Sequence, residues 1–367
     1  MRPKKRQKTN SYAMRITIVG NFGCGNLGDE AILSGLKTLI LKKHRGAEIT
    51  VLGKGKLLPI GLRSFLKSLV QWRLWSQPLH ALKEADYVII GGGGLFTDEE
   101  SRRGTVLWTL HGIVAHFMGR KVLCLGVSIG KMGWLSTQLA KVLFRRALSV
   151  VVRDKKSLDR SLAWGIDAAL APDLALANDV QLESSEVNTA SEKYVVINLR
   201  EFKNYNEKMI QLFVQLADFL VADFGYKIVF LPLSTDAHSD SYILNKILIQ
   251  MKHSEKAEVD DEKDTIYEIV NLMCGAELVI SMRLHGSIFS ILAEVPVLPI
   301  AYMDKVKNFW SGEQLKVTPL SVESITLEVL KKDVLEHLNS RERMQRNMRD
   351  YKKELAVRFD PVTRPIL

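Results

Sequence analysis

The chain has few residues of the kinds that cross-link a fold or hold a metal ion. Its 367 residues include three cysteines, Cys24, Cys124 and Cys274, which lie far apart and form no Cys-x-x-Cys pair. An odd number of scattered cysteines does not indicate a disulfide framework, and it fits a reducing, cytoplasmic location. No group of potential ligands has the spacing of a metal site, so we expect no metal.

Long apolar runs are also missing. No uninterrupted run reaches the roughly 18 apolar residues that a membrane-spanning helix needs. Residues 1–14 are basic and polar and lack the apolar core of a signal peptide, so we interpret them as a disordered basic arm. The net charge of +10 favours anionic partners. The basic residues are dispersed and match no nucleic-acid module, so nucleic acid is not an expected partner.

What the chain does have is one pattern repeated in two halves: an apolar strand, a turn that contains glycine, and an amphipathic helix. This alternation predicts parallel sheets with helices on both faces, an α/β fold of two Rossmann-like domains. In the first half we expect strands at 15–19, 48–52, 87–90, 121–125 and 149–152, and helices at 28–43, 105–118 and 135–146.

A polar, acidic stretch at 181–192 reads as a linker between an N-terminal domain, 15–180, and a C-terminal domain, 193–335. Residues 336–367 form a charged helical tail whose last part we expect on the first domain. A ligand site would lie in the cleft between the domains, where strands end and helices begin. In the second half we expect strands at 194–199, 227–231, 278–281 and 297–300, and helices at 208–224, 239–251, 265–274 and 286–293.

The first candidate motif is the glycine-rich turn Gly20–Glu30, which follows a strand and opens a helix. Glycines let backbone amides approach an anion, and a helix start favours negative charge. Asp29 and Glu30 at that start would repel a pyrophosphate, so the turn departs from a dinucleotide loop. We take Asn26, Gly28 and Asp29 as candidate site residues. The alternative is structural: Asp29 caps the helix and Asn26 supports the turn.

The second motif is a run of four glycines, Gly91–Gly94, directly after the strand at 87–90. Such a run predicts a close approach of the backbone to a ligand or to an opposing loop. Gly92, Gly93 and Gly94 are therefore candidate binding residues. The alternative is a tight turn without a ligand.

The third motif is Ser281–Ser287, which again joins a strand to a helix. The helix dipole would favour the neutral form of His285 and leave it free to take a proton. Arg283 offers a forked donor for phosphate or carboxylate. The alternative is that His285 merely caps the helix and Arg283 forms a surface or interdomain ion pair.

Two further strand ends carry cations. Arg153-Asp154 ends the strand at 149–152, and Tyr302 and Lys305 follow the strand at 297–300. Arg153 and Lys305 are candidates for holding a carboxylate or phosphate, and Tyr302 for binding substrate. The alternatives are a surface Arg153 beside a capping Asp154, and a solvated Lys305 with the neighbouring Lys307 as a competing candidate.

Taken together, these motifs resemble the polysaccharide pyruvyl transferase family, and the resemblance covers roughly residues 15–310. The tyrosine-lysine segment of that family usually reads Tyr-Asp-Pro-Lys, whereas this chain has Met303-Asp304 before Lys305. The matching segments are Gly25 to Glu30, Gly91 to Gly94, Arg153-Asp154, Pro172-Asp173, Arg283-Leu284-His285 and Tyr302 to Val306.

The resemblance implies a GT-B-like pair of domains, phosphoenolpyruvate as donor, and a sugar hydroxyl pair as acceptor, often on a lipid-diphosphate-linked precursor. No cofactor beyond the donor is implied. It places donor binding and catalysis on Arg153, His285 and Lys305. His285 suits general acid–base work, and the two cations suit carboxylate and phosphate charge. Asp29 is a candidate for protonating the enol carbon if a closed cleft raises its pKa.

Three rival functions fit parts of the sequence. A glycosyltransferase with a nucleotide-sugar donor would share the fold. A dinucleotide oxidoreductase would need Gly-x-Gly-x-x-Gly, which Gly23, Gly25 and Gly28 match literally, but the acidic pair after Gly28 argues against it. A non-catalytic homologue would have no reason to keep all three candidate catalytic residues.

Residues 62–83 combine arginines and lysines with Trp72 and Trp75. A basic helix that carries tryptophan is typical of contact with a membrane surface, here the inner face, and would suit a lipid-linked acceptor. The alternative is an amphipathic helix that covers the first sheet.

Overall fold

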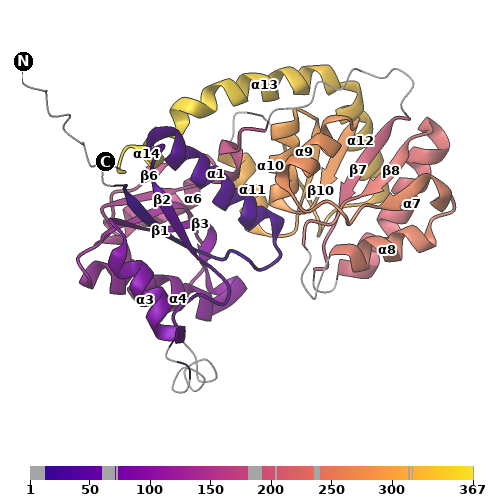
Figure 1. Ribbon diagram of the computed structural model, residues 1–367. Coiled ribbons are helices and arrows are strands. Elements are labelled where there is room, and N and C mark those ends of the chain that lie inside the picture. The colour runs from indigo at the N-terminus through magenta and orange to yellow at the C-terminus, as the bar shows by residue number, and fades with distance from the viewer. Residues whose placement is uncertain are drawn as a thin grey trace, which may run out of the picture.

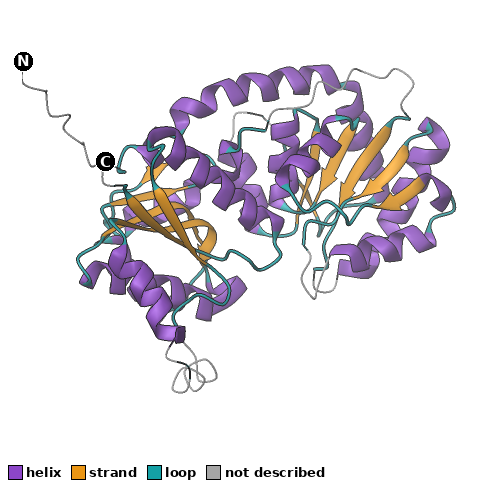
Figure 2. Ribbon diagram, in the orientation of Figure 1, coloured by secondary structure: helices purple, strands orange, loops and turns teal. Residues whose placement is uncertain are grey.

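The computed structural model contains two parallel six-stranded sheets, each with helices on both faces (Figures 1 and 2). The strand orders are β2-β1-β3-β4-β5-β6 and β12-β11-β10-β7-β8-β9. The α/β class and the two Rossmann-like sheets are as predicted. The structure describes residues 13–59, 71, 73–180, 192–202, 205–234, 240–312, 315 and 317–366.

The first sheet lies within the predicted domain 15–180. Its central strands are apolar at nearly every position because helices cover both faces. The elements in chain order are β1 (Arg15–Val19), α1 (Leu27–Lys43), β2 (Glu48–Leu52), α3 (Arg73–Glu84), β3 (Tyr87–Phe96), α4 (Asp98–Phe117), β4 (Lys121–Ile129), α5 (Trp134–Phe144), β5 (Ser149–Val152), α6 (Lys155–Ala163), β6 (Ala169–Leu170) and the 3-10 helix η1 (Leu174–Ala177).

The second sheet lies within the predicted domain 193–335. Its elements are β7 (Tyr194–Asn198), α7 (Asn206–Phe224), β8 (Lys227–Phe230), α8 (Asp240–Gln250), η3 (Ser254–Lys256), β9 (Ala257–Val259), α9 (Ile266–Cys274), β10 (Leu278–Ser281), α10 (Leu284–Ala293), β11 (Val297–Ala301), α11 (Asp304–Gly312) and β12 (Leu320–Ser321).

The C-terminal tail returns to the first domain. After α12 (Leu327–Asn339), the long helix α13 (Arg341–Arg358) runs from the second lobe to the first, where α14 (Asp360–Thr363) lies near α1 (Figure 1). Lys43 Nζ donates a hydrogen bond to the Thr363 carbonyl at 2.7 Å. The boundary predicted after residue 335 falls inside α12, because that helix continues unbroken to Asn339.

The glycine run is not a turn. We expected the strand to stop at residue 90, but β3 continues to Phe96 and pairs with β4 through Gly91 and Gly93. Gly92 and Gly93 have φ values of +84° and +87°, which glycine adopts without strain. A Cβ atom on Gly92 would lie 2.0 Å from Cγ2 of Ile32 in α1. The glycines therefore let α1 pack directly on the strand.

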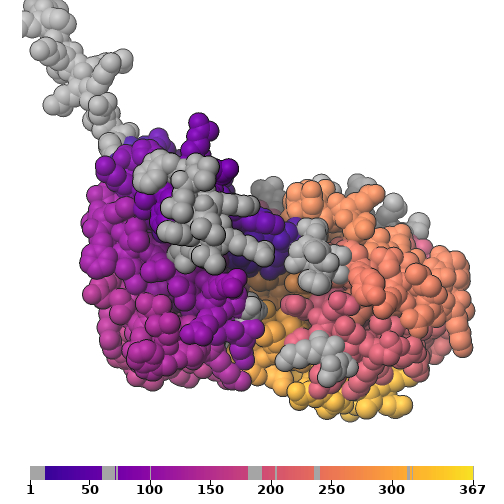
Figure 3. Space-filling view, turned by 90° about the horizontal axis from the view of Figure 1, so that it is seen from below, coloured from indigo at the N-terminus to yellow at the C-terminus, as the bar shows by residue number. Residues whose placement is uncertain are grey.

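The two domains share part of their core. One cluster of buried apolar side chains includes residues of both sheets, and α10 contacts both α1 and η1. In the space-filling view, indigo atoms of the N-terminal segment lie in the groove between the lobes (Figure 3).

Several predictions fall outside the described residues: nearly all of the arm 1–14, the linker up to residue 191, and the part of 62–83 before Arg73 apart from residue 71. The described remainder of that last segment is α3. Within the described ranges, no helix has both the length and the apolar character needed to cross a bilayer.

Candidate active site

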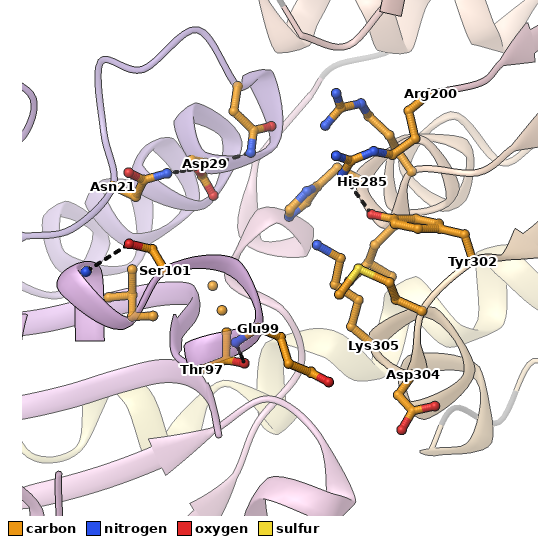
Figure 4. Close-up of a pocket in the computed structure, with 18 of the residues that line it drawn as sticks. Asn21, Asp29, Thr97, Glu99, Ser101, Arg200, His285, Tyr302, Asp304 and Lys305 are labelled. Carbon is orange, nitrogen blue, oxygen red and sulfur yellow. Dashed lines mark hydrogen bonds between the residues drawn. The ribbon is translucent and has the colours of Figure 1, made fainter. Parts of the chain in front are cut away.

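A cleft of about 1180 Å³ lies between the two domains (Figure 4). Its walls are built where strands end, as expected for parallel sheets. The N-terminal domain contributes the turn after β1, the end of β3 and the residue after β5. The C-terminal domain contributes the residues that follow β7, β10 and β11. Of the candidate residues, Asn26, Asp29, Gly93, Gly94, Arg153, Arg283, His285, Tyr302 and Lys305 line this cleft.

His285 is the second residue of α10, and its ring lies against the start of α1. A Cβ atom on Gly28 would be only 1.9 Å from Nδ1 of His285. Gly28 therefore does not line the cleft; it leaves the space that the imidazole of the other domain occupies. On the other side of the ring, the shielded Nε2 has no hydrogen-bond partner among the described residues.

The surroundings of His285 decide its protonation state. Burial lowers its pKa to about 4; nearby Asp173 opposes the shift, and the positive charges of Arg153, Lys305 and Arg283 add to it. The ring is therefore neutral near pH 7, as expected. Burial, rather than the helix dipole we invoked from the sequence, is the main cause.

Arg153 is buried, not on the surface. Its Nη1 forms an ion pair with Asp173 at 2.6 Å, and its Nε donates to Ser128 Oγ at 2.7 Å. Asp173 is the acid of the Pro-Asp motif. Asp154 caps α6 by accepting from the amide of Ser157, as its alternative interpretation proposed. The two neighbouring residues thus have different tasks, and only Arg153 reaches the cleft.

Arg283 forms an ion pair within its own domain. Its Nε and Nη2 donate to the two carboxylate oxygens of Asp240 at 2.6 and 2.7 Å. Asp240 is 1% exposed and also accepts from the amide of Leu233. The expectation of a surface or interdomain ion pair is therefore wrong, because the partner is a buried carboxylate of the same domain. The charge of Arg283 still acts on His285.

Lys305 and Lys307 diverge on α11. Lys305 lines the cleft, with Nζ 5.9 Å from the centroid of the Tyr302 ring, whereas Lys307 is exposed and lines no part of the cleft. The structure thus places in the cleft the lysine that the sequence analysis chose over its neighbour.

Asp29 does not cap α1. Asn26 is the cap and accepts from the Gly28 amide at 3.1 Å. The carboxylate of Asp29 instead accepts from the side-chain amides of Asn21 at 2.9 Å and Asn26 at 3.0 Å (Figure 4). The interpretation of Asp29 as a helix cap is therefore wrong.

Several backbone amides of the turn already donate hydrogen bonds within the protein. Glu30 accepts from the amide of Gly23 at 2.6 Å, and the amide of Leu27 donates across the domain boundary to the Leu233 carbonyl at 3.3 Å. With the Gly28 amide taken by Asn26, these groups do not cradle a phosphate. Of the glycine run, Gly93 and Gly94 line the cleft, whereas Gly92 packs on α1.

The sequence reasoning missed a second set of cleft residues. Arg200 follows β7, and Phe202 and Tyr205 lie just beyond it. The rule that picked Arg153 and Lys305, a cation at the carboxyl end of a strand, also applies to Arg200. The N-terminal wall adds Thr97, Ser101, Trp108 and Lys131, which no comparable pattern in the sequence indicates.

Comparisons with solved structures support the arrangement of the two domains. A putative UDP-N-acetylglucosamine 2-epimerase from Listeria monocytogenes is similar with a TM-score of 0.62 at 13% identity, over 92% of this chain and 90% of that chain. The glycosyltransferase of kitacinnamycin has a TM-score of 0.50 at 12% identity, over 96% and 97% of the two chains. At such identities the likeness shows the fold alone, which is GT-B-like.

Sequence comparisons reach further. The amylovoran biosynthesis protein AmsJ of Erwinia amylovora is 24% identical over 356 residues, which cover 80% of this chain and 84% of AmsJ. A family model described as polysaccharide pyruvyl transferase matches residues 26–304, well over half of the chain. This range contains the end of the glycine-rich turn from Asn26 onward, Arg153, Arg283 and His285. The chain therefore belongs to the polysaccharide pyruvyl transferase family.

Proposed function

We propose that the protein transfers the pyruvyl group of phosphoenolpyruvate to two hydroxyl groups of a saccharide, closing a ketal and releasing phosphate. The observation that carries this proposal is the setting of His285: a neutral imidazole in a cleft, with Arg153, Lys305 and Arg283 close enough to shift its pKa. Phosphoenolpyruvate bears a phosphate and a carboxylate, so several cations are needed to bind it.

The reaction sets the demands on the site. One hydroxyl adds to C2 of the enol, and the C3 methylene takes a proton and becomes a methyl group. The bond from C2 to the phosphate oxygen breaks, and the second hydroxyl attacks C2. One of the two hydroxyl protons ends on C3 of the product, and the other ends on the released phosphate. The site must therefore supply a base, an acid and cations for the leaving group.

His285 fits the base. It is neutral before the donor binds, and the negative charge of the donor would raise its pKa, so that it can accept a hydroxyl proton. Lys305 and Arg153 are the proposed stabilisers of the charge on the leaving phosphate. Arg153 is held in place for this task by its buried pair with Asp173.

Asp29 is better suited to binding the acceptor saccharide than to protonating the enol carbon. The side-chain amides of Asn21 and Asn26 donate to its carboxylate and hold it in a fixed orientation. A fixed carboxylate is instead suited to accept hydrogen bonds from sugar hydroxyls. We therefore propose that Asn26, Asp29 and the backbone of Gly93 and Gly94 bind the acceptor on the N-terminal wall.

Trp108, Thr97 and Ser101 on the same wall suit a sugar ring, which presents both apolar faces and hydroxyls. A lipid-diphosphate-linked saccharide, met at the membrane surface, belongs to this proposal as the acceptor. No cofactor other than the donor is needed for the atom balance.

The proposal is tested by incubating the protein with phosphoenolpyruvate and a panel of saccharides. We expect phosphate release together with a product whose mass has increased by a pyruvate ketal. A parallel panel with nucleotide sugars is the contrast. Glycosyl transfer from those donors with no reaction of phosphoenolpyruvate would refute the proposal.

Within this assay, His285→Ala should lower the rate by at least about 100-fold, since general base catalysis contributes that much. Lys305→Ala should lower turnover strongly, because the leaving phosphate loses a cation. Lys307→Ala is the matched control on the exposed side of α11 and should react like the parent protein. Equal losses in the two lysine variants would show that the role of Lys305 is misassigned.

A further inference from the structure

Arg200 differs from the other arginines of the cleft in its partners. Arg153 and Arg283 each pair with a buried carboxylate. In the described part of the chain, Arg200 forms no ion pair. Its Nη1 donates to the neutral hydroxyl of Tyr302 at 2.9 Å, and its buried Nε has no partner there. A buried donor without an acceptor is costly, and that cost is removed when a ligand supplies one.

Arg200 is held in a defined position. Its guanidinium carbon lies 5.0 Å from the centroid of the Tyr302 ring, a cation–π distance. Tyr302 is 8% exposed, and Phe202 packs edge-on against it with centroids 5.0 Å apart. Phe202 in turn stacks on Tyr205 at 6.2 Å. The aromatic side chains therefore fix both the arginine and the phenol before any ligand binds.

This pair lies on the C-terminal wall of the cleft, together with His285, Arg283 and Lys305. In the close-up, Arg200, Tyr302, Lys305 and His285 face a common space, opposite Asp29 of the other domain (Figure 4). Arg200 is not among the charges that shift the pKa of His285, whereas Lys305 and Arg153 are. The positive charges of the cleft thus divide into a group at the imidazole, to which both domains contribute, and a separate guanidinium beside a phenol.

The two parts suit the two anionic groups of the donor. A planar guanidinium matches the planar carboxylate, and the Tyr302 hydroxyl, which accepts from Arg200, retains its own proton to donate. A phosphate is tetrahedral, carries more charge and must leave during the reaction, so it fits the cations that surround the base.

We propose that Arg200 and Tyr302 bind the carboxylate of the donor and thereby select a carboxylate-bearing enol phosphate over other phosphate esters. This assignment rests on the proposed function. It adds a specificity-determining pair to the phosphate-binding and catalytic residues.

Titration calorimetry without an acceptor tests the assignment with three ligands: phosphoenolpyruvate, its analogue with a neutral carboxamide in place of the carboxylate, and inorganic phosphate. Arg200→Met should weaken phosphoenolpyruvate about 10- to 100-fold, the effect of losing a charge-assisted hydrogen bond. The other two ligands should change by less than about threefold, within the smallest hydrogen-bond effects. Tyr302→Phe should lose less affinity for phosphoenolpyruvate than Arg200→Met does.

Two further variants keep the test decisive. Arg200→Lys retains the charge without the planar fork and should bind phosphoenolpyruvate with intermediate affinity, even if Arg200→Met folds poorly. Arg343→Met, on the exposed side of α13, is the matched control and should bind all three ligands as the parent does.

The outcomes separate this assignment from the proposed function. Unchanged affinity of Arg200→Met for phosphoenolpyruvate, or an equal loss for inorganic phosphate, would overturn the carboxylate assignment alone. A parent protein that does not bind phosphoenolpyruvate would overturn the proposed function as well.

Discussion

At the scale of single residues, the chemistry depends on which charged groups are already satisfied by the protein. Arg153 is paired with Asp173, and two nitrogens of Arg283 with Asp240, so both arginines are rigid sources of positive charge. His285 is neutral because it is buried among such charges. Sequence spacing identified all three residues, but it contained no sign of their partners, since an ion pair depends on which side chains are buried together.

The depressed pKa of His285 links stability to pH. An unfolded histidine has a pKa of about 6.5, and the folded value is about 4. Between these values the unfolded state binds the additional proton, so the free energy of unfolding falls as the pH drops through this range, by up to about 3 kcal/mol. Urea denaturation at pH 7.5 and pH 4.5 measures this change in the free energy of unfolding.

The matched variant is His285→Gln, which has no titrating group at this position. We expect it to lose less stability than the parent between the two pH values. Identical losses would mean that His285 is protonated to the same extent in the folded and unfolded states, contrary to its burial.

At the scale of elements, most strands and helices follow from apolar periodicity. The ends of β1, β2, β5 and β10 match the sequence prediction. The extension of β3 does not follow from the sequence. Four glycines predict a break by every local rule, yet the packing of α1 on β3 requires residues without side chains there.

Gly92→Ala measures how strongly the packing of α1 on β3 requires a residue without a side chain. The new Cβ would meet Ile32 at 2.0 Å and sit at a φ of +84°, so overpacking and strain together should cost about 2–5 kcal/mol. Gly55→Ala is the matched control, with a φ of +80° and nothing within 4 Å, and should show the strain alone. Urea denaturation curves give both values. A loss no larger than that of Gly55→Ala would contradict the packing role of Gly92.

At the scale of the whole molecule, the site is assembled by contact between the domains. The start of α1 meets the start of α10 at Gly28 and His285, and Asn26 pairs with Ser234 across the same boundary. Helix α13 and the tail beyond it tie the second lobe to the first (Figure 1). The position and protonation of His285 therefore depend on the domains being together.

Gly28→Ala tests this dependence. Its methyl group would overlap the imidazole, so His285 must shift or the domains must separate. We expect the rate to fall roughly 10- to 100-fold, as for a displaced catalytic group. Greater hydration should also raise the pKa of His285, so the acidic limb of the pH–rate profile should move to higher pH.

The control for this variant is Gly46→Ala, where the added methyl group meets nothing within 4 Å. It should retain the rate and the pH profile of the parent. A Gly28→Ala protein with a lower rate and an unchanged acidic limb would show that the glycine affects something other than the histidine.

The sequence by itself determined the fold class, the repeated strand-turn-helix pattern and the strand ends that carry Arg153, His285 and Lys305, because these are set by local periodicity and chain order. Only the tertiary structure decided which residues are neighbours. It placed Lys305 rather than Lys307 in the cleft. It placed the imidazole of His285, rather than a ligand, against Gly28, and it brought Arg200 within hydrogen-bond distance of Tyr302. Such contacts join segments far apart in the chain, and no local pattern encodes the distance between them.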